Sequence, residues 1–374
     1  MWRQESKDSP PFATPNAAPP SAAAWLPGPF PDTVPPETRG MRLLFIKLRH
    51  IGDALILTPT LTAVRAAYPT AEIWVVVRRG SEGILAGCTA IDQIRTTAPP
   101  ERSGRGWRDF TRGLALVREL RERRFDWAFE LSDGDRGRLL ARLSGARQTA
   151  ATSVNVPMNT LARWAIRRFD THDWTPGHRV EKDHHTVSAF LPLGGEVPPM
   201  TFDPARRLPW GPGSSLTQFA VLHPGTRWRR KRWPAEGWIS VGRALAGRGL
   251  QVVVSSGPDP EERAGAAALV AAIGNGTLST DGQAGWTQLG WLLGRARLFV
   301  GVDTAAMHLA AACGCPVVGI FGPSVVSQWR PWRVPHQVIT PPEGTTAEND
   351  PEGIRRVRAT DVLEACSRLL DSPR

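Results

Sequence analysis

The chain has 374 residues, of which 41% are hydrophobic, and a formal net charge of +11. This length exceeds what one hydrophobic core usually serves and predicts two domains. No apolar run approaches the roughly 20 residues of a transmembrane helix, and we expect no secretory signal. The four cysteines lack a second Cys/His pair at metal-binding spacing, so we expect reduced cytoplasmic thiols and no metal site.

The positive charge is compatible with three kinds of partner: nucleic acid, an anionic membrane surface, or a phosphorylated substrate. Basic residues are spread along the chain, with clusters at 121–124, 227–232 and 330–333. Charge alone therefore does not choose among the three.

Residues 1–40 differ in composition from the rest, because ten of them are proline. Such a segment buries too little apolar surface to offset its ordering entropy. We predict a disordered arm there.

The first predicted domain, 41–210, begins with a βαβ unit. Apolar strands are predicted at 43–46 and 73–77, with a helix between them that starts at Thr58 as N-cap and Pro59 as the first residue. Nearly continuous apolar strands favour a parallel sheet covered on both faces. A helix at 107–123, a strand at 127–131 and a helix at 136–143 are expected to follow.

Residues 145–215 contain four histidines in a polar stretch, His172, His178, His184 and His185. Their spacing matches no metal-site pattern. We expect a polar loop and a surface helix.

A second α/β domain is predicted at 211–355, because strands and helices alternate strictly from residue 217 onward. The predicted strands and helices are 219–222, 238–245, 251–255, 261–273, 286–293, 298–301, 304–312 and 316–321. Residues 356–374 contain a last helix, for which packing back on the N-terminal domain is an option. Two doubly wound domains place a cleft between the carboxyl ends of their sheets, where ligands bind.

The first chemical motif, Lys47 to Asp53, directly follows the first strand. Gly52 permits a tight turn, and Asp53 then lies at or near a helix start. A carboxylate there can serve as a general base or simply cap the helix. His50 can orient an acceptor or be an ordinary loop residue.

Two further motifs indicate anion binding. Residues 223–234 place five cations within six positions beside Trp228 and Trp233, which suits a diphosphate. Residues 300–312 run from a strand into a helix capped by Asp303 or Thr304, whose free N–H groups attract anions. Small Ala305 and Ala306 let a ligand approach the backbone.

Two weaker signals remain. Residues 255–262 form a strand, a glycine turn and an acidic first helical turn, where a carboxylate can accept hydrogen bonds from ribose. Ser132-Asp133-Gly134-Asp135 is interpreted as a turn first, an acceptor contact second and a metal site last. Neither a P-loop nor a G-x-G-x-x-G motif follows the first strand, which argues against those nucleotide-binding classes.

Taken in order, the motifs at 45–55, 231–234, 301–312, 321–324 and 329–332 resemble glycosyltransferase family 9, the ADP-heptose:lipopolysaccharide heptosyltransferases. The resemblance runs from about residue 41 to the carboxyl terminus. Residues 47–53, 256–259 and 329–332 are most similar to the heptosyltransferase III branch.

The resemblance implies the GT-B fold, an α/β architecture of two doubly wound Rossmann-like domains facing a central cleft. It implies metal-independent, inverting transfer of heptose from ADP-heptose to a hydroxyl of the lipopolysaccharide inner core, without a cofactor and without a nucleic-acid partner. The enzyme would be cytoplasmic, with a peripheral contact to the inner face of the inner membrane left open.

The resemblance also implies roles for individual residues. Asp53 would be the general base, and Lys231 would stabilise the leaving diphosphate. The implied donor-binding residues are Thr226, Arg227, Glu262 (or its neighbour Glu261), Asp303, Thr304, Ala305, Ala306, Met307 and His308. The implied acceptor-binding residues are Arg49, His50 and Asp133.

Two departures from the family pattern bear on specificity: Ala305 stands where the family often has glycine, and the 227–230 loop is unusually basic. Alternatives from other classes are another GT-B enzyme with a different nucleotide-sugar, such as an epimerase, a catalytically silent binding homologue, and a nucleic-acid binder. A nucleic-acid binder would lose affinity steeply with salt and ignore free ADP.

Overall fold

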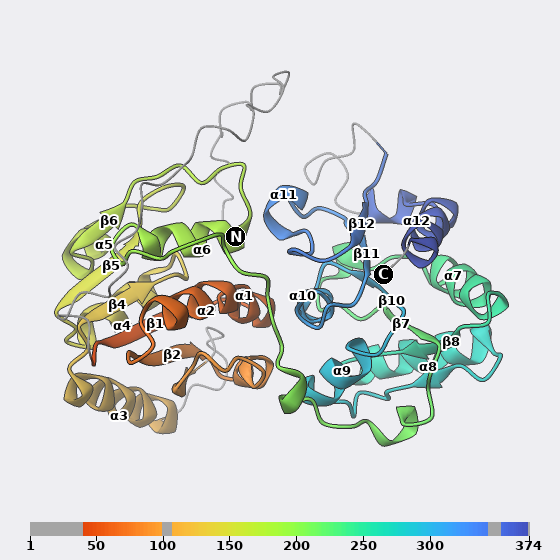
Figure 1. Ribbon diagram of the computed structural model, residues 1–374, viewed down its shortest axis with the longest axis horizontal. Helices are drawn as coiled ribbons and strands as arrows, with labels where there is room; N and C mark the ends of the chain where they lie inside the picture. Colours follow the sequence, from red (N-terminus) through yellow and green to blue (C-terminus); the bar gives the residue numbers. More distant parts are fainter. Residues whose placement is uncertain (1–39, 99–106, 343–352, 373–374) are drawn as a thin grey trace, which may run out of the picture. The chain divides into compact units, whose positions relative to one another are not determined.

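The computed structural model describes residues 40–98, 107–342 and 353–372 (Figure 1). The predicted arm, apart from Gly40, lies outside these residues. All contacts below belong to the compact unit 35–374.

The first sheet has six parallel strands in the order β3-β2-β1-β4-β5-β6. The strands are β1 (Arg42–Lys47), β2 (Glu72–Arg78), β3 (Gln93–Thr97), β4 (Trp127–Glu130), β5 (Gln148–Thr152) and β6 (Arg168–Asp170). The helices of this half are α1 (Ile51–Ile56), α2 (Thr58–Ala67), α3 (Trp107–Arg123), α4 (Asp135–Leu143), α5 (Thr160–Ala165) and α6 (Arg179–Ser188).

Strand β1 lies at the centre of this sheet and is apolar on both faces. Its alternate residues Leu43 and Phe45 pack with α1, α2 and α6, whereas Leu44 and Ile46 pack with α3, α4 and α5. Two covered faces explain why the strand is a continuous apolar run, as expected for a parallel sheet.

The second sheet repeats the same connectivity, with its strands in the order β12-β11-β10-β7-β8-β9. The strands are β7 (Phe219–His223), β8 (Gln251–Val254), β9 (Leu278–Ser279), β10 (Leu298–Val302), β11 (Val317–Ile320) and β12 (His336–Ile339). The helices are α7 (Ala235–Gly247), α8 (Pro260–Ile273), α9 (Trp286–Leu293), α10 (Ala305–Ala312), α11 (Val326–Trp329) and α12 (Ala359–Asp371).

The carboxyl-terminal helix α12 packs on the second sheet. It contacts α7 and strands β10 to β12, and its buried residues Val362, Ala365 and Cys366 join the core formed by α7 and α8. These contacts are with the second domain, and packing of α12 on the N-terminal domain stays a prediction. Helix α12 is strongly amphipathic, and its apolar side is the one that packs on the second sheet.

The predicted α/β alternation is confirmed, with three differences in detail. Helix α2 starts at Thr58 itself, with Leu57 as its N-cap, because the short helix α1 precedes it directly. Strands β3, β5, β6, β9 and β12 were not predicted, since they are short edge or near-edge strands with polar residues. The helix expected at the surface is α6, which buries Lys182 and Asp183.

Both sheets reverse their strand order at one point, between β1 and β4 and between β7 and β10. Parallel sheets of this kind bind ligands outside the carboxyl ends of the strands at such a reversal. The motifs after β1, β7 and β10 therefore all fall at the favoured positions. Among the residues that the structure describes, no helix is long and apolar enough to cross a membrane.

Candidate active site

A cavity of about 620 Å³ lies where loops from both sheets meet. It is lined by His50, Ile51, Gly52, Asp53, Arg78, His223, Gly225, Thr226, Arg227, Trp228, Arg230, Lys231, Gly257, Pro258, Asp259, Glu262, Trp286, Asp303, Thr304, Ala305, Ala306, His308, Pro323, Ser324, Val325 and Trp329. The predicted base, the basic loop and the second anion-binding helix thus share one cavity.

Asp53 is 5% exposed and belongs to a capping box at the start of α1. Its Oδ2 accepts a hydrogen bond of 3.1 Å from the backbone N–H of His50. Asp53 is thus the third residue of the helix rather than its N-cap. This contact fixes the carboxylate at the cavity wall and leaves Oδ1 for another partner.

Helices α1 and α10 meet through their amino-terminal turns, and Gly52 is the closest point. A Cβ built on Gly52 would lie 3.1 Å from Cδ2 of His308 and 3.4 Å from Cα of Ala305. Only a residue without a side chain fits without displacing these neighbours. Glycine at this position therefore sets the approach of Asp53 to the start of α10.

Lys231 is anchored on Asp303 at the end of β10. Its Nζ donates to Oδ2 of Asp303 at 2.6 Å and to the backbone carbonyl of the same residue at 3.2 Å. The ammonium group thereby stands beside the first turn of α10, whose free N–H groups carry a partial positive charge. Thr304 caps this helix, and its buried Oγ1 has no hydrogen-bond partner among the described residues.

His308 lies one turn into α10 and is buried at the cavity wall. Burial is the main cause that lowers the pKa of its imidazole, opposed by the charges of Asp303 and Asp53. Its Nε2 is 3.9 Å from Oδ1 of Asp303, and its buried Nδ1 has no hydrogen-bond partner within the part of the chain that the structure describes. A neutral imidazole here can exchange hydrogen bonds with a bound ligand.

The basic loop after β7 contributes an aromatic and cationic wall. The guanidinium groups of Arg227 and Arg230 lie 5.8 and 5.4 Å from the ring centroid of Trp228, and Nη2 of Arg227 is 3.5 Å from Nδ1 of His50. Arg232 instead pairs with Glu261 on the surface. Arg227, Arg230 and Lys231 are therefore the cations of this loop that reach the cavity.

Glu262 reaches the cavity across two glycines. A Cβ on Gly225 or Gly257 would lie 2.7 or 2.8 Å from its Oε2, which also accepts a hydrogen bond from the N–H of Gly257 at 3.1 Å. Of the two neighbouring acids, Glu261 pairs with Arg232 on the surface and Glu262 lines the cavity.

Of four other predicted donor-binding residues, Thr226, Ala305 and Ala306 line the cavity and Met307 does not. Thr226 is buried at the cavity wall, and its Oγ1 accepts a hydrogen bond from the N–H of Trp228. Ala305 and Ala306 line the cavity at the start of α10. Met307 does not: it is fully buried in the core, with Sδ packed toward Gly319. The helical turn that places Ala306 at the cavity wall directs its neighbour Met307 into the core.

Arg49 and Asp133 do not line this cavity. Asp133 is enclosed by Arg49 at 3.5 Å, Arg179 at 3.3 Å and Lys182. Burial raises the pKa of its carboxyl, but the charges of Lys182, Lys47 and Arg179 outweigh this effect and lower it. The predicted acceptor contacts are therefore members of a separate ion network at the ends of β1 and β4. His50, by contrast, does line the cavity.

This network continues onto α6 and to the loop after α11. Lys47 forms a buried ion pair with Asp183 at 2.6 Å, and the Arg179 guanidinium lies 5.3 Å from the ring centroid of Trp329 in the cavity wall. His178 contacts the backbone carbonyl of Arg330 through Nε2 at 2.9 Å, and burial lowers its pKa to about 3. The amino terminus of α6 thus holds one wall of the cavity.

Sequence reasoning missed three lining residues, Arg78, Trp286 and Val325. Arg78 ends β2, beside the carboxyl end of β1, so its place next to a switch-point strand was the available signal. Trp286 begins α9, and its Cδ1 would lie 3.0 Å from a Cβ on Gly83. Nothing in its local sequence distinguishes it from a core tryptophan.

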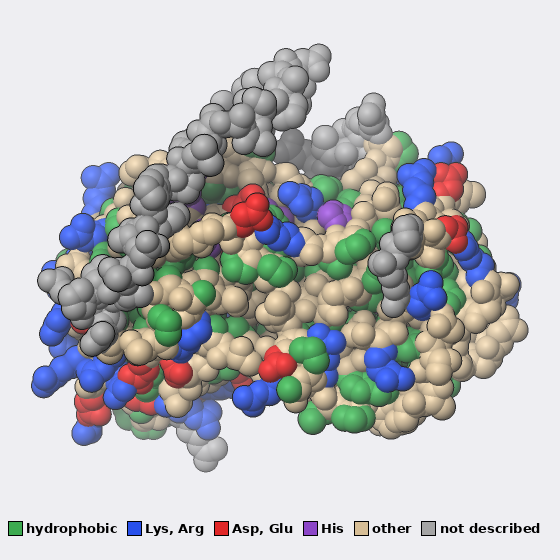
Figure 2. Space-filling view, viewed as in Figure 1, with side chains coloured by type: hydrophobic (Ala, Val, Ile, Leu, Met, Phe, Trp, Pro, Cys, Tyr) green, Lys and Arg blue, Asp and Glu red, His purple; other side chains and the backbone are tan. Residues whose placement is uncertain are grey.

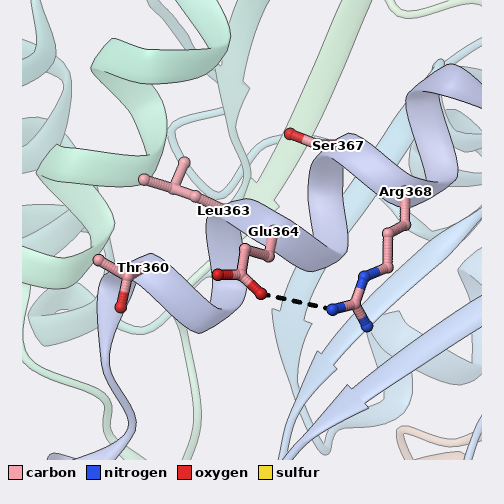
Figure 3. A pocket seen from close by; sticks show the side chains of 5 residues that line it. All are labelled: Thr360, Leu363, Glu364, Ser367 and Arg368. Carbon is pink, nitrogen blue, oxygen red and sulfur yellow. Dashed lines mark hydrogen bonds and ion pairs between the residues drawn. The ribbon is translucent and has the colours of Figure 1, made fainter.

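Two other features do not join the site. Among the described residues, no group of three His, Cys, Asp or Glu side chains is arranged to hold a metal ion. A shallow hollow on α12 is lined only by that one helix, through Thr360, Leu363, Glu364, Ser367 and Arg368 (Figure 3). Its ion pair joins Glu364 and Arg368 at 3.3 Å, one turn apart, and is an ordinary surface contact.

Comparison with known proteins agrees with this geometry. The sequence model of glycosyltransferase family 9 (heptosyltransferase) matches residues 113–352. Lipopolysaccharide heptosyltransferase 3 of Escherichia coli is 28% identical over 301 residues, covering 76% of this chain and 84% of that protein. The structure of E. coli heptosyltransferase WaaC with ADP superposes with a TM-score of 0.75 at 20% identity, covering 88% of this chain and 100% of that one. The same enzyme with ADP-2-deoxy-2-fluoro heptose superposes with a TM-score of 0.72 at 20% identity, covering 88% and 99%.

Two parallel six-stranded sheets that share a cavity at their carboxyl ends form the GT-B architecture. The chain belongs to glycosyltransferase family 9. The predicted resemblance to this family, and to its heptosyltransferase III members, is confirmed.

Proposed function

We propose that this enzyme transfers heptose from ADP-heptose to a hydroxyl of the lipopolysaccharide inner core, with inversion at the anomeric carbon. The observation that carries the proposal is the meeting of α1 and α10 at Gly52, which places Asp53 and the Lys231–Asp303 pair in one cavity. The similar proteins are lipopolysaccharide heptosyltransferases, and we take the sugar and the class of acceptor from them.

In the proposed reaction, Asp53 accepts the proton of the acceptor hydroxyl. The hydroxyl oxygen forms a bond to the anomeric carbon of heptose while the bond from that carbon to the diphosphate oxygen breaks. The electron pair of the broken bond leaves with ADP. The fixed position of Asp53 supports this role, because a general base must lie within hydrogen-bond reach of the proton that it removes.

The departing ADP gains negative charge, and two groups beside the cavity offset it. The Lys231 ammonium is held at Asp303, and the amino-terminal N–H groups of α10 point into the same space. Preorganised positive groups of this kind stabilise a leaving diphosphate without reorganising during the reaction. This supports a metal-independent reaction.

The remaining cavity residues are each assigned to one part of the donor. We assign Glu262 to the ribose hydroxyls, Thr226 and Arg227 to the diphosphate, and Asp303 to the heptose. Thr304, Ala305, Ala306 and His308 supply the floor against which the diphosphate and sugar lie. His50 faces the acceptor side beside Asp53. An enzyme with this donor and acceptor acts in the cytoplasm, on the inner face of the inner membrane.

Thermal-shift measurements against ADP-, UDP-, GDP- and dTDP-sugars test the donor assignment. A ligand that binds only the folded state raises the melting temperature as its concentration exceeds the dissociation constant. ADP-heptose should raise it most. A larger rise with a sugar nucleotide of another base would replace the proposed donor.

A chelator tests the metal-free mechanism. Dialysis against EDTA should leave the transfer rate unchanged, and adding Mg²⁺ or Mn²⁺ afterwards should not increase it. A rate that falls with EDTA and returns with one of these ions would show that Lys231 and α10 do not suffice for the leaving group.

A further inference from the structure

Helix α3 carries an apolar stripe that faces away from the protein. Trp107, Phe110 and Leu114 are spaced by three and four residues and are 77%, 55% and 55% exposed. The rings of Trp107 and Phe110 contact each other, with centroids 5.4 Å apart. The core contacts of this helix are made instead by Leu116 and Leu120. Large apolar side chains gathered outside the core mark an interaction surface.

The same stripe continues as arginine. Arg118 and Arg121 follow Leu114 at helical spacing and are exposed. The helix has five arginines and three acids, and the acids pair with arginine: Asp109 with Arg79, Glu119 with Arg95 and Glu122 with Arg118. Lysine and arginine side chains gather over the part of the molecule where α3 lies (Figures 1 and 2).

The neighbouring helices of this layer add to the surface. Helices α3, α4 and α5 cover one face of the first sheet. Leu139 of α4 is 39% exposed and Trp164 of α5 is 52% exposed, and the guanidinium of Arg142 lies 5.1 Å from the ring centroid of Trp164. Tryptophan and arginine on an amphipathic helical surface are the side chains that bind the boundary between lipid headgroups and acyl chains.

The first turn of α3 is joined by an ion pair to the end of β2, which contributes to the cavity wall. Arg79 joins Asp109 in the first turn of α3 at 3.0 Å, and its neighbour Arg78 lines the cavity. In a parallel sheet the helix after a strand begins at the carboxyl edge, which is the edge that bears Asp53. A bilayer bound at Trp107 and Phe110 would therefore lie at the carboxyl edge of the first sheet, the edge that contributes Asp53 to the cavity.

We propose that the outer face of α3 to α5, centred on Trp107, Phe110, Leu114, Arg118 and Arg121, docks the enzyme on an anionic phospholipid bilayer. The aromatic end enters the headgroup region, and the arginines contact phosphate groups. Docking then presents the rim of the cavity to a membrane-anchored acceptor. This last consequence rests on the proposed function, whereas the docking itself does not.

Vesicle sedimentation with the full chain tests the proposal, without donor or acceptor present. The wild-type protein should bind vesicles of phosphatidylglycerol mixed with phosphatidylethanolamine and bind pure phosphatidylcholine weakly. The triple variant Trp107→Ser/Phe110→Ser/Leu114→Ser should bind the anionic vesicles at least about tenfold more weakly, because three apolar side chains no longer insert. Leu208→Ser, which removes an exposed leucine elsewhere, is the matched control and should bind as wild type.

The arginines have a separate readout. Arg118→Gln and Arg121→Gln should each lower the preference for anionic over neutral vesicles about fivefold, the effect of about one basic residue near a charged surface. Wild-type protein that ignores anionic vesicles, or a triple variant that still binds them, would overturn the proposal. A wild-type protein that is dimeric and a triple variant that is monomeric would also overturn it, because this face would then be covered by a second copy of the chain.

A transfer assay on a delipidated, soluble acceptor separates this proposal from the proposed function. The triple variant should keep wild-type activity there and lose activity on acceptor embedded in vesicles. Lost activity on both acceptors would indicate damage to the active site and would overturn the assignment of α3 to docking. If the wild type transfers to neither acceptor but binds anionic vesicles, the function fails and the docking surface stands.

Discussion

Nζ of Lys231 is hydrogen-bonded to both the carboxylate and the backbone carbonyl of Asp303, at 2.6 and 3.2 Å. One lysine from the loop after β7 is thereby fixed at the carboxyl end of β10, across the strand-order reversal of the second sheet. The pair fixes a positive charge beside the amino terminus of α10. It is the clearest preorganised feature of the leaving-group side.

Replacing this lysine should slow the chemical step. Lys231→Ala should lower kcat about 100-fold, the usual effect of removing one preorganised group that stabilises transition-state charge. Arg229→Ala, which removes an exposed cation of the same loop, is the control. Steady-state kinetics with both variants measures this, and equal losses would mean that only the general charge of the loop matters.

Replacing the proposed base should slow transfer strongly while preserving the fold. In Asp53→Asn the side-chain oxygen can still accept from the N–H of His50, so helix α1 keeps its cap. We expect a loss of kcat of about 1,000-fold with ADP affinity unchanged, since a neutral amide cannot take a proton. Asp361→Asn, at the same helical position of α12, controls for the loss of a first-turn acid. Full activity of Asp53→Asn would end the assignment.

The contact between α1 and α10 can be tested with one methyl group. Gly52→Ala places a Cβ about 3.1 Å from Cδ2 of His308, so the His308 ring or the start of a helix must move by a few tenths of an ångström. We expect about a tenfold loss of kcat/KM, since small misplacements of reacting groups are costly. Gly265→Ala in α8, where a Cβ meets nothing within 4 Å, is the control. Calorimetry should show that both variants are folded. Wild-type activity of Gly52→Ala would show that the close contact between α1 and α10 is not needed for catalysis.

The ion network beside β4 predicts a dependence of stability on pH. Burial, and then the charge of Asp133, raise the pKa of Glu130 from 4.5 to about 7. Below pH 4.5 the carboxyl is protonated in both folded and unfolded chains. Between 4.5 and 7 only the unfolded chain ionises, so stability falls as pH rises, by about 3 kcal/mol at full effect.

Glu130→Gln removes this titration. Relative to wild type, the free energy of unfolding of the variant should increase as pH rises from 4.5 to 7 and then level off. Urea unfolding across this range measures the difference, with surface Glu364→Gln as control. A difference that is flat with pH would show that Glu130 is ionised in the folded protein throughout.

Much of the fold could be predicted from sequence because the central strands are continuous apolar runs. Edge strands such as β3 escaped because their residues are half exposed and polar. The motifs after β1, β7 and β10 predicted that Asp53, Lys231 and Asp303 share one cleft, because parallel sheets bring the loops after their strands to one edge.

The rest of the site depends on tertiary contacts that no local pattern encodes. Met307 turns inward because the core beside Gly319 accepts it, while Ala306 one position earlier meets the cavity. Asp133 accepts hydrogen bonds from Arg179 and Lys182 of α6, which are more than 40 residues away in sequence. Arg232, from another loop, pairs with Glu261 on the surface, so that Glu262 and not Glu261 lines the cavity.

Direct observation of the transferred sugar tests the central claim. Purified enzyme is incubated with ADP-heptose and a lipopolysaccharide inner-core acceptor, and the new glycosidic linkage is assigned by NMR. The account predicts one heptose added per acceptor, with the anomeric configuration opposite to that of the donor, and product formed about 1,000-fold more slowly with Asp53→Asn. Retention of the donor configuration, or product formed equally well by the variant, would contradict it.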